Sequence, residues 1–377
     1  MSPPDVTIVA HDIGAVGGME RVLGELIEGL SEAGHRVTVV ARKCALPPLA
    51  GVTFHRVRGP GRPFSIAYPW FFLAGSLALR RHRRGVVQST GAIVFGHVDL
   101  MAVHYLHQVG PVNPSRSSAA YRLQVKAAGV LKRLGERLVY PRCRAAAFVC
   151  VSNGVADEVR EHFPALADRV VTIHNGVDTA GFAPGVRAAD AQALRERLEL
   201  QDGAPVAVFV GSEWYRKGLD TVLQALPDAP GWRLLVAGSG DEQRYRAMAG
   251  ELGVGDRVRW LGVVADVAPL YELCDAFVLP SSYETFSLVS FEAAASGVPV
   301  LAAPVSGVRE LIEDGRNGFL IDRDPATVAA RLRELAADEQ LRARMGAAAR
   351  ESALQFSWER MVARHRELYE RIASGSA

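Results

Sequence analysis

The chain has 377 residues, which is more than one ordinary hydrophobic core organises, so its length predicts two α/β domains. Apolar residues make up 49% of the sequence and charged residues 22%, a composition that excludes a disordered chain. The formal net charge is only +2, so overall charge gives no support to a nucleic-acid partner.

The cysteines, the first residues and the apolar stretches of the sequence indicate the cellular compartment. The four cysteines have neither CxxC pairing nor a Cys/His spacing typical of zinc, which favours a reducing compartment. The opening residues, MSPPDVTIVAHD, carry no basic segment followed by a long apolar one, so we expect no secretory signal. The longest apolar stretch, residues 64–79, contains Pro69 and Gly75 and is too short for a transmembrane helix. We therefore expect a cytoplasmic protein.

Short β-branched runs alternate with helical segments along the chain. In the first half the predicted strands are residues 6–10, 37–41, 147–151 and 170–173. In the second half they are residues 206–210, 234–237, 258–261, 276–279 and 300–302. Continuous apolar strands between helices are typical of parallel sheets that are buried on both faces. The fold class predicted is therefore α/β, with two Rossmann-like, doubly wound domains.

A linker separates the two predicted domains. Residues 178–203 contain Gly181, Pro184 and Gly185 and a short charged helix, after which VAVFVG begins a new first strand. We place the domains at residues 1–180 and 181–356. Residues 357–377 follow a helical pattern, but periodicity does not tell which domain this helix covers. Parallel sheets bind ligands at the carboxyl ends of their strands, so two such edges that face each other form a cleft.

The first strand leads into HDIGAVGGMERVLGELIEGL, in which Gly14, Gly17 and Gly18 precede an amphipathic helix. Glycines let a backbone approach a ligand closely, and the helix N-terminus offers amide donors. The spacing differs from GxGxxG, which weakens a dinucleotide interpretation. A ligand-binding loop and a plain tight turn both remain open at this point.

The first strand of the second half leads into GSEWYRKGLDTVLQAL. Arg216 and Lys217 fall just before a helix that begins near Gly218, so two cations and free amides converge in one place. That combination suits a diphosphate, although a solvated basic turn gives the same pattern.

The most informative stretch is SSYETFSLVSFEAAASGVPVLAAPVSG, in which Glu284 and Glu292 stand eight residues apart. A carboxylate on a helix accepts hydrogen bonds from vicinal hydroxyls such as those of a ribose, and one in the preceding loop can face a sugar. The helix begins near Thr285 or Phe286, so its first amides suit phosphate. Taken alone, two glutamates at this spacing are weak evidence.

Several motifs in order resemble the retaining glycosyltransferases of family 4, which have the GT-B fold. The motifs cover nearly the whole chain: GGMERVLGELIEGLSEAGHRVTVV, VSNGVADEV, IHNGVDTAGFAP, GSEWYRKGLDTVLQAL, VAGSGDE, LYELCDAFVLPSSYETFSLVSFEAAASGVPVLA and FSWERMVARHRELY. The resemblance implies a retaining hexosyltransferase that moves a sugar from a nucleotide-sugar donor, with UDP-sugar favoured over GDP-sugar. It implies a glycan, lipid-linked or small-molecule acceptor in cell-envelope glycan synthesis.

The resemblance also implies roles for single residues. Arg216 and Lys217 would hold the donor diphosphate, Glu292 the ribose and Glu284 the sugar. The final helix would pack back on the acceptor-binding first domain, while the second domain binds the donor. The donor-binding residues implied are Gly17, Gly18, Gly211, Arg216, Lys217, Gly238, Val263, Glu284, Thr285, Phe286, Ser287, Leu288 and Glu292.

Two departures from the family pattern concern the donor site. Many relatives carry Gly-Arg after the first strand of the second domain, whereas Ser212 follows Gly211 here. Relatives commonly have EGFG around the first glutamate, whereas this chain has Glu284 followed by Thr285, Phe286 and Ser287. The loop beside the sugar is therefore bulkier, and the sequence does not specify the donor sugar, the base or the acceptor.

The family usually has a histidine near the donor sugar, after a strand of the first domain. In HVDLMAVHYLHQVG the best match is His104, with His107 second. His104 would contact a sugar hydroxyl or stabilise developing positive charge, although a histidine merely packed at a strand end is the alternative. The catalytic residues implied are His104, Glu284, Arg216 and Lys217. Further candidates on the acceptor side are His107, Asp99 and Met19.

The expected mechanism is front-face transfer without a metal or another cofactor. No DxD-type signature follows a predicted strand, and cations and helix amides would neutralise the leaving diphosphate. Two alternatives stay open, namely another GT-B enzyme such as a nucleotide-sugar epimerase, and a non-catalytic nucleotide-sugar-binding protein. A phosphorylase would need a lysine for pyridoxal phosphate, and Lys217 is the only lysine after Lys132.

Two segments of the first half suggest contact with the inner face of a membrane. Residues 116–144 carry eight basic side chains against one acid, Glu136. Residues 68–72 are rich in aromatic side chains and are followed by four arginines at positions 80, 81, 83 and 84. Both segments can be amphipathic helices that rest on anionic lipid, or ordinary helices with solvated basic faces.

Overall fold

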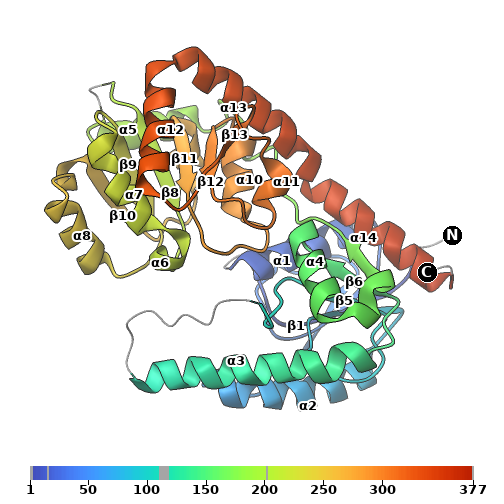
Figure 1. Ribbon diagram of the computed structural model, residues 1–377. Coiled ribbons are helices and arrows are strands. Elements are labelled where there is room, and N and C mark those ends of the chain that lie inside the picture. Colours follow the sequence, from blue (N-terminus) through green and yellow to red (C-terminus); the bar gives the residue numbers. More distant parts are fainter. Residues whose placement is uncertain (1–2, 15–16, 110–118, 201–202, 376–377) are drawn as a thin grey trace. The chain divides into compact units, whose positions relative to one another are not determined.

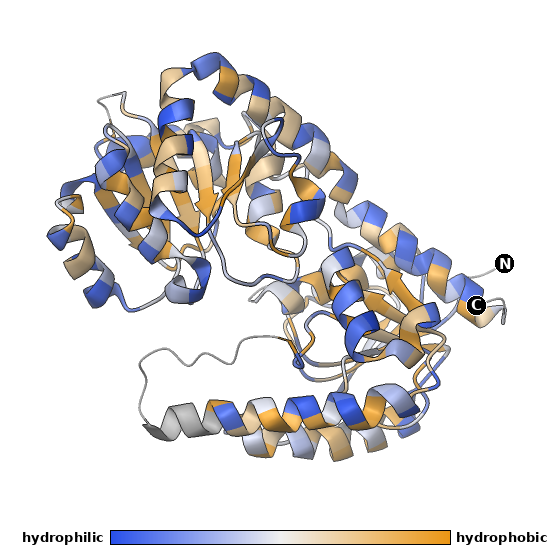
Figure 2. Cartoon of the chain, in the orientation of Figure 1, coloured by the Kyte–Doolittle hydropathy of each residue, from blue (hydrophilic) through white to orange (hydrophobic). Residues whose placement is uncertain are grey.

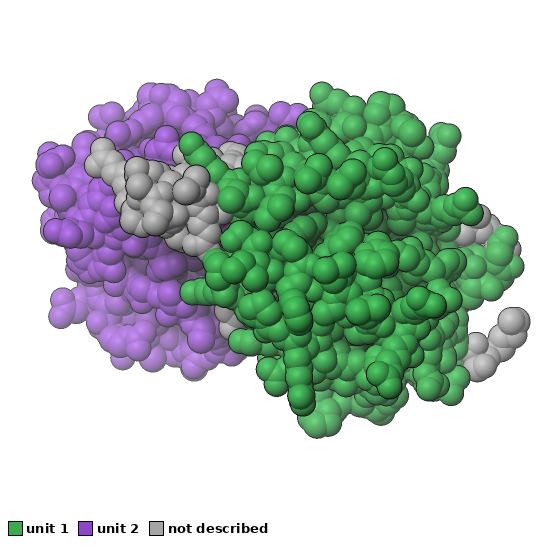
Figure 3. Space-filling model, turned by 90° about the horizontal axis from the view of Figure 1, so that it is seen from below, with its two compact units in different colours: residues 1–176, 358–377 green, residues 177–357 purple. Residues whose placement is uncertain are grey.

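The computed structural model describes residues 3–14, 17–109, 119–200 and 203–375 (Figure 1). The chain divides into two compact units, which are distinguished by colour in Figure 3. Unit 1 contains residues 1–176 and 358–377, and unit 2 contains residues 177–357. The chain therefore enters unit 2 once and returns to unit 1 for its last helix. The boundaries lie within four residues of those predicted.

Unit 1 is built on a seven-stranded parallel sheet with the order β3-β2-β1-β4-β5-β6-β7. Its strands are β1 (Val6–Ile13), β2 (Val37–Cys44), β3 (Val52–Arg56), β4 (Val86–Thr90), β5 (Leu100–Val103), β6 (Ala147–Cys150) and β7 (Val170–Thr172). The helices are α1 (Gly18–Glu32), α2 (Phe64–His82), α3 (Ala119–Val139), α4 (Asn153–His162) and α14 (Trp358–Ala373), with short 3₁₀ turns η1 (Tyr140–Arg142) and η2 (Pro164–Arg169).

The final helix of the chain, α14, packs against α1 and β4 of unit 1. Gly29 of α1 is needed there, since a β-carbon at this position would collide with Val362. Tyr369 is fully buried and donates a hydrogen bond of 2.5 Å from its hydroxyl to Gln88 Oε1 on β4. A buried amide of a central strand is thereby satisfied by the last helix of the chain.

Unit 2 is built on a six-stranded parallel sheet with the order β10-β9-β8-β11-β12-β13. The strands are β8 (Val206–Val210), β9 (Arg233–Ala237), β10 (Val258–Gly262), β11 (Ala276–Leu279), β12 (Val300–Ala302) and β13 (Gly318–Leu320). The helices are α5 (Ala188–Arg197), α6 (Trp214–Lys217), α7 (Leu219–Ala225), α8 (Glu242–Glu251), α9 (Ala268–Leu273), α10 (Leu288–Ala295), α11 (Val308–Leu311), α12 (Pro325–Ala337) and α13 (Glu339–Ala353), with 3₁₀ turns η3 (Leu226–Asp228), η4 (Gly255–Arg257) and η5 (Leu354–Phe356).

The two doubly wound parallel sheets confirm the predicted fold class. In Figure 2 the strands of each unit are strongly apolar and the surrounding helices are more polar. Three strands were not predicted, namely β3, β4 and β13, whereas β5 is the strand expected just before His104. The edge strand β3 is largely exposed, β4 carries buried polar side chains such as Gln88, and β13 has only three residues. None of these patterns gives the apolar run by which the other strands were predicted. Within the described residues, no helix is both long enough and apolar enough to cross a bilayer.

Candidate functional site

A cluster of charged side chains forms in unit 2 where α6 meets the segment after β11. Lys217 Nζ lies 2.7 Å from Glu284 Oε1, and Arg216 Nη1 lies 3.4 Å from the same oxygen. Arg216 also donates to the carbonyl oxygen of Tyr283 at 2.6 Å, and Ser281 Oγ donates to Glu284 Oε1 at 2.8 Å. Two cations and a hydroxyl therefore converge on one carboxylate oxygen.

The charge of Glu284 is stabilised by these neighbours. Burial acts to raise the pKa of this carboxyl, but the charges of Lys217 and Arg216 and hydrogen bonds from Lys217 and Ser281 outweigh it, so the pKa is lowered. Glu284 is therefore ionised at neutral pH. Arg216 also pairs with the exposed carboxylate of Glu213, at 2.9 Å, so the two cations of the cluster are balanced by two carboxylates.

Two glycines let the backbone approach this cluster. A β-carbon at Gly211 would collide with the side chain of Lys217, and one at Gly238 would collide with the carbonyl oxygen of Gly211. Gly211 follows β8 and Gly238 follows β9, which are neighbouring strands. Beside them, Ser239 Oγ donates to Ser212 Oγ at 2.9 Å. Glycine at both positions thus allows the loops at the carboxyl ends of β8 and β9 to meet.

The turn into α10 is strained but well held. Ser287 precedes the helix in the left-handed region with φ 71°, and its hydroxyl lies 2.8 Å from that of Ser290. Phe286 is buried and stacks on Phe291 with ring centroids 4.0 Å apart, while Thr285 and Leu288 are half-buried. A non-glycine residue with positive φ is uncommon and marks a turn that the surrounding packing imposes.

Glu292 lies on α10 and is buried, with the hydroxyl of Tyr271 3.5 Å from its Oε2. The structure therefore joins Arg216, Lys217 and Glu284 directly, whereas the hydroxyl beside Glu292 belongs to Tyr271 of α9. Val263, in the loop after β10, is 79% exposed and packs into neither group. Ser281 and Tyr271 stand inside the motifs quoted above, but sequence analysis did not single them out because neither side chain carries a charge.

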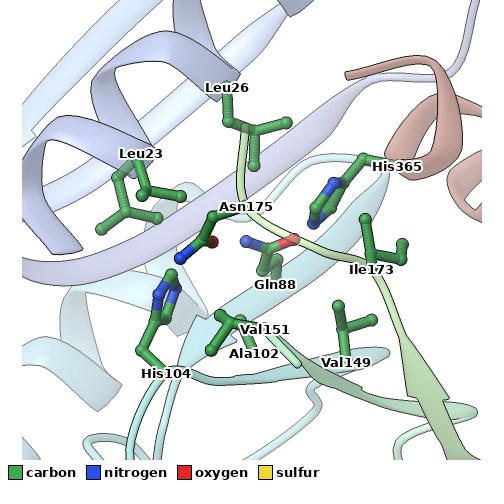
Figure 4. A pocket seen from close by; sticks show the side chains of 11 residues that line it. Leu23, Leu26, Gln88, Ala102, His104, Val149, Val151, Ile173, Asn175 and His365 are labelled. Atoms are coloured by element: carbon green, nitrogen blue, oxygen red, sulfur yellow. The ribbon is translucent and has the colours of Figure 1, made fainter. Parts of the chain in front are cut away.

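In unit 1, His104 follows β5 and lines a small cavity of about 10 Å³, which is enough for about one water molecule (Figure 4). Polar groups of Gln88, Asn175 and His365 also line it, and the rest of the wall is aliphatic. Burial lowers the pKa of His104 to about 4 and that of His365 to about 4, and the charge of His365 adds to the shift of His104. Both imidazoles are therefore neutral at pH 7.

We predict that unit 1 loses stability as the pH falls from about 6.5 to about 4. In the unfolded chain His104 and His365 bind protons in this range, whereas in the folded chain they do not. Each histidine therefore lowers the unfolding free energy by at most about 1.4 kcal/mol for each pH unit of the fall. Hydrogen exchange at pH 7.5, 6 and 5 measures how the stability of unit 1 depends on pH. His365→Gln should reduce the slope, while His162→Gln, at an exposed position on α4, should leave it unchanged. An unchanged slope in His365→Gln would contradict the prediction.

The other candidates of unit 1 lie apart from His104. The backbone amide of His107 and its Nδ1 both lie within 2.8 Å of Glu136 Oε1 on α3, so that ring is held by a buried carboxylate. Asp99 precedes β5, whereas His104 follows it, so the two lie at opposite ends of the strand. Asp99 accepts a hydrogen bond from the amide of Val87 at 2.8 Å. The structure does not bring Asp99 together with His104.

The glycine loop before α1 presents open backbone. Gly17 precedes the helix with φ 99°, and a β-carbon there would collide with the carboxylate of Glu20. Gly17 and Gly18 are exposed, and Met19 is half-buried at the start of the helix. Gly17 thus has the positive φ that favours glycine, whereas Gly18 is the first residue of the helix.

Comparison with known proteins gives matches over both units. Residues 16–180 match the family described as Glycosyltransferase Family 4, and residues 190–352 match Glycosyl transferases group 1. A D-inositol 3-phosphate glycosyltransferase of Geodermatophilus obscurus is 33% identical, over 93% of this chain and 83% of that protein. The chain belongs to the family 4 glycosyltransferases. The resemblance inferred from the sequence motifs is confirmed.

Solved structures of glycosyltransferases share the fold of this family 4 enzyme. WaaG, a glycosyltransferase involved in lipopolysaccharide biosynthesis, aligns with a TM-score of 0.78 at 18% identity, over 96% of this chain and 99% of that chain. Anabaena HepE in complex with UDP and glucose aligns with a TM-score of 0.73 at 20% identity, over 97% and 99%. At this level of identity the likeness establishes the GT-B fold alone.

Proposed function

We propose that this glycosyltransferase is a retaining enzyme that takes its sugar from a nucleotide-sugar, with UDP-sugar favoured and GDP-sugar second. The observation that carries the proposal is the pairing of Lys217 and Arg216 on Glu284 beside the first turn of α10. Glu213, the other partner of Arg216, is 66% exposed, so a diphosphate can displace its side chain and bind Arg216 together with Lys217. The first amides of α10, which lack acceptors within the helix, add donors.

The parts of the donor have separate binding residues in this proposal. Lys217 and Arg216 bind the diphosphate, the carboxylate of Glu292 accepts hydrogen bonds from the ribose hydroxyls, and Glu284 accepts them from the sugar. Burial of Glu292 on α10 supports a role that needs a fixed carboxylate. The structure of HepE with UDP and glucose supports UDP as the first nucleotide to test.

Transfer proceeds on the front face of the donor. The acceptor oxygen bonds to the anomeric carbon on the side from which the diphosphate leaves, and a phosphate oxygen of the leaving group takes the acceptor proton. The configuration is therefore retained. Lys217, Arg216 and the α10 amides stabilise the developing negative charge, which is why we propose that the reaction needs no metal. His104 would donate a hydrogen bond to a sugar hydroxyl.

The acceptor is a glycan, a lipid-linked molecule or a small molecule. Curated relatives are named D-inositol 3-phosphate glycosyltransferases, so an acceptor screen begins with inositol phosphates and then turns to glycans and lipid-linked sugars. Nuclear magnetic resonance of the product's anomeric proton tests retention once an acceptor is found.

The nucleotide assignment is tested by thermal unfolding of the purified chain with UDP, GDP, ADP and dTDP in the presence of EDTA. We expect UDP to raise the unfolding temperature of unit 2 by several degrees at a hundred times its Kd, since such binding adds about 2.7 kcal/mol. Glu292→Ala should abolish the shift, and Glu251→Ala, at an exposed position on α8, should preserve it.

Each outcome of this experiment has a definite meaning. A shift with GDP alone would replace UDP by GDP in the proposal, and a shift that EDTA removes would contradict metal independence. No shift with any nucleotide at millimolar concentration would reject the donor site described above.

A further inference from the structure

Charge is distributed very unevenly along the chain. Residues 33–156 contain eighteen lysines and arginines but only two acids, Asp99 and Glu136, while the whole chain has a net charge of +2. Both acids are occupied, because Asp99 binds the amide of Val87 and Glu136 binds His107. The part of unit 1 that contains α2 and α3 is therefore strongly basic, and the excess of acids lies elsewhere in the chain.

Helix α2 exposes a continuous apolar stripe in this basic part. Ile66, Trp70, Leu73 and Leu77 recur every three or four residues, so they share one side of the helix, and each is 50% to 66% exposed. The opposite side packs inward, where Phe71 and Leu79 are buried. Single exposed apolar side chains are common on protein surfaces, but four large ones in a row form a continuous apolar patch.

Helix α3 repeats the arrangement beside α2 (Figure 1). Val130, Leu134 and Leu138 are spaced by four residues and are 49% to 55% exposed. The other side of α3 faces α2, since Lys132 Nζ lies 4.5 Å from the ring centroid of Phe64. Each helix thus packs through one side and presents aliphatic side chains on the other. Apolar and charged segments alternate along both helices in Figure 2.

Exposed cations accompany both stripes. Arg80 and Arg81 lie in the last turn of α2, and Lys126 and Arg137 lie on α3. We name the exposed side chains Ile66, Trp70, Leu73, Leu77, Arg80, Arg81, Lys126, Val130, Leu134, Arg137 and Leu138 the helix-pair surface.

We propose that the helix-pair surface docks on the anionic headgroups of a phospholipid bilayer. Apolar stripes on amphipathic helices enter the boundary between headgroups and acyl chains, while neighbouring cations bind lipid phosphates. A second copy of the chain is disfavoured, because two strongly basic surfaces would repel each other. A nucleic acid would use the cations but leave the aliphatic stripes in water. The inference is independent of the nucleotide site in unit 2.

Flotation of the full chain with vesicles tests the proposal. We expect binding to vesicles of equal parts phosphatidylcholine and phosphatidylglycerol, little binding to phosphatidylcholine alone, and weaker binding at 0.5 M salt. Leu73→Ser/Leu77→Ser and Arg80→Glu/Arg81→Glu should each reduce the fraction bound at least about tenfold. All four positions are exposed, so the variants should fold, and unchanged melting curves with and without UDP check this.

Matched controls distinguish an effect of the helix-pair surface from the loss of any exposed apolar or basic side chain. Val186→Ser/Leu354→Ser removes exposed apolar side chains of unit 2, and Arg197→Glu/Arg371→Glu reverses exposed arginines on α5 and α14, which are not part of the helix-pair surface. Both should bind vesicles like the unaltered chain. The proposal is overturned if the unaltered chain ignores anionic vesicles, or if control and test variants lose binding equally. A dimer that Leu73→Ser/Leu77→Ser dissociates, without vesicle binding, would assign the surface to a second copy.

Discussion

Replacing Lys217 with methionine should weaken UDP binding about tenfold to a hundredfold and lower kcat/KM by about two to three orders of magnitude. The larger effect on turnover is expected because charge on the diphosphate grows as the sugar departs, and one preorganised donor to such charge contributes that much. Isothermal titration with UDP measures the first quantity. Hydrolysis or transfer of labelled UDP-sugar measures the second, and Arg333→Ala, an exposed cation on α12, is the control.

The same replacement also leaves a buried carboxylate with less compensation. Glu284 keeps Arg216 at 3.4 Å and Ser281 at 2.8 Å but loses its shortest ion pair, so the unfolding free energy should fall by about 2–4 kcal/mol. Loss of activity alone would therefore not separate a ligand contact from a structural one.

The double variant Lys217→Met/Glu284→Gln makes that separation. Removing the carboxylate's charge should restore much of the lost stability, because no uncompensated buried charge then remains. Affinity for UDP should stay low, since the cation that binds the diphosphate is still missing. Recovery of UDP affinity together with stability would show that Lys217 only holds Glu284, and our assignment would fail.

In unit 2 the candidate site residues could be identified from the sequence, because they stand in short continuous motifs. Arg216 and Lys217 stand together before a helix, and Glu284 stands just before another, so a sequence shows each as a candidate. The pairing between them spans 67 residues and depends on β8 and β11 being neighbours in the sheet. Periodicity carries no such information. The sequence therefore predicted the participants but not the ion pairs between them.

Nearness in sequence was less reliable in unit 1. Asp99 and His104 stand five residues apart, and the strand between them carries them roughly 16 Å from each other along its direction. Asp99 consequently supports the amino end of the sheet, and His104 lies at the carboxyl end. His107 stays on the same side as His104, but Glu136 lies 29 residues further along and holds it. The sequence did not indicate that Glu136 is the buried partner of His107, because it is a single acid in an otherwise basic helix.

For the last helix, the sequence predicted the secondary structure but not the surface on which the helix packs. Trp358, Met361, Leu368 and Tyr369 recur at helical spacing and are buried. Such a stripe fits any apolar surface. What specifies the site is complementarity with residues far away, namely Gly29 beside Val362 and Gln88 beneath Tyr369.

Tyr369→Ala should therefore destabilise unit 1 by about 3–5 kcal/mol, because it removes a fully buried aromatic ring and leaves the Gln88 amide without its phenol donor. Tyr369→Phe keeps the ring and should cost about 1–2 kcal/mol. Hydrogen exchange measured by mass spectrometry should show faster exchange in β1, β4 and α14 and unchanged exchange in β8 and β11. The neighbouring exposed Glu370→Ala should change stability by less than about 0.5 kcal/mol.

The pattern of exchange, more than its size, decides whether α14 is a structural part of unit 1. If α14 completes the core of unit 1, its loss exposes the face of β4 that carries Gln88, and protection falls there together with α1. If exchange rose equally in both units, or only within α14 itself, the helix would be a peripheral cover, and its packing on α1 and β4 would contribute little to folding.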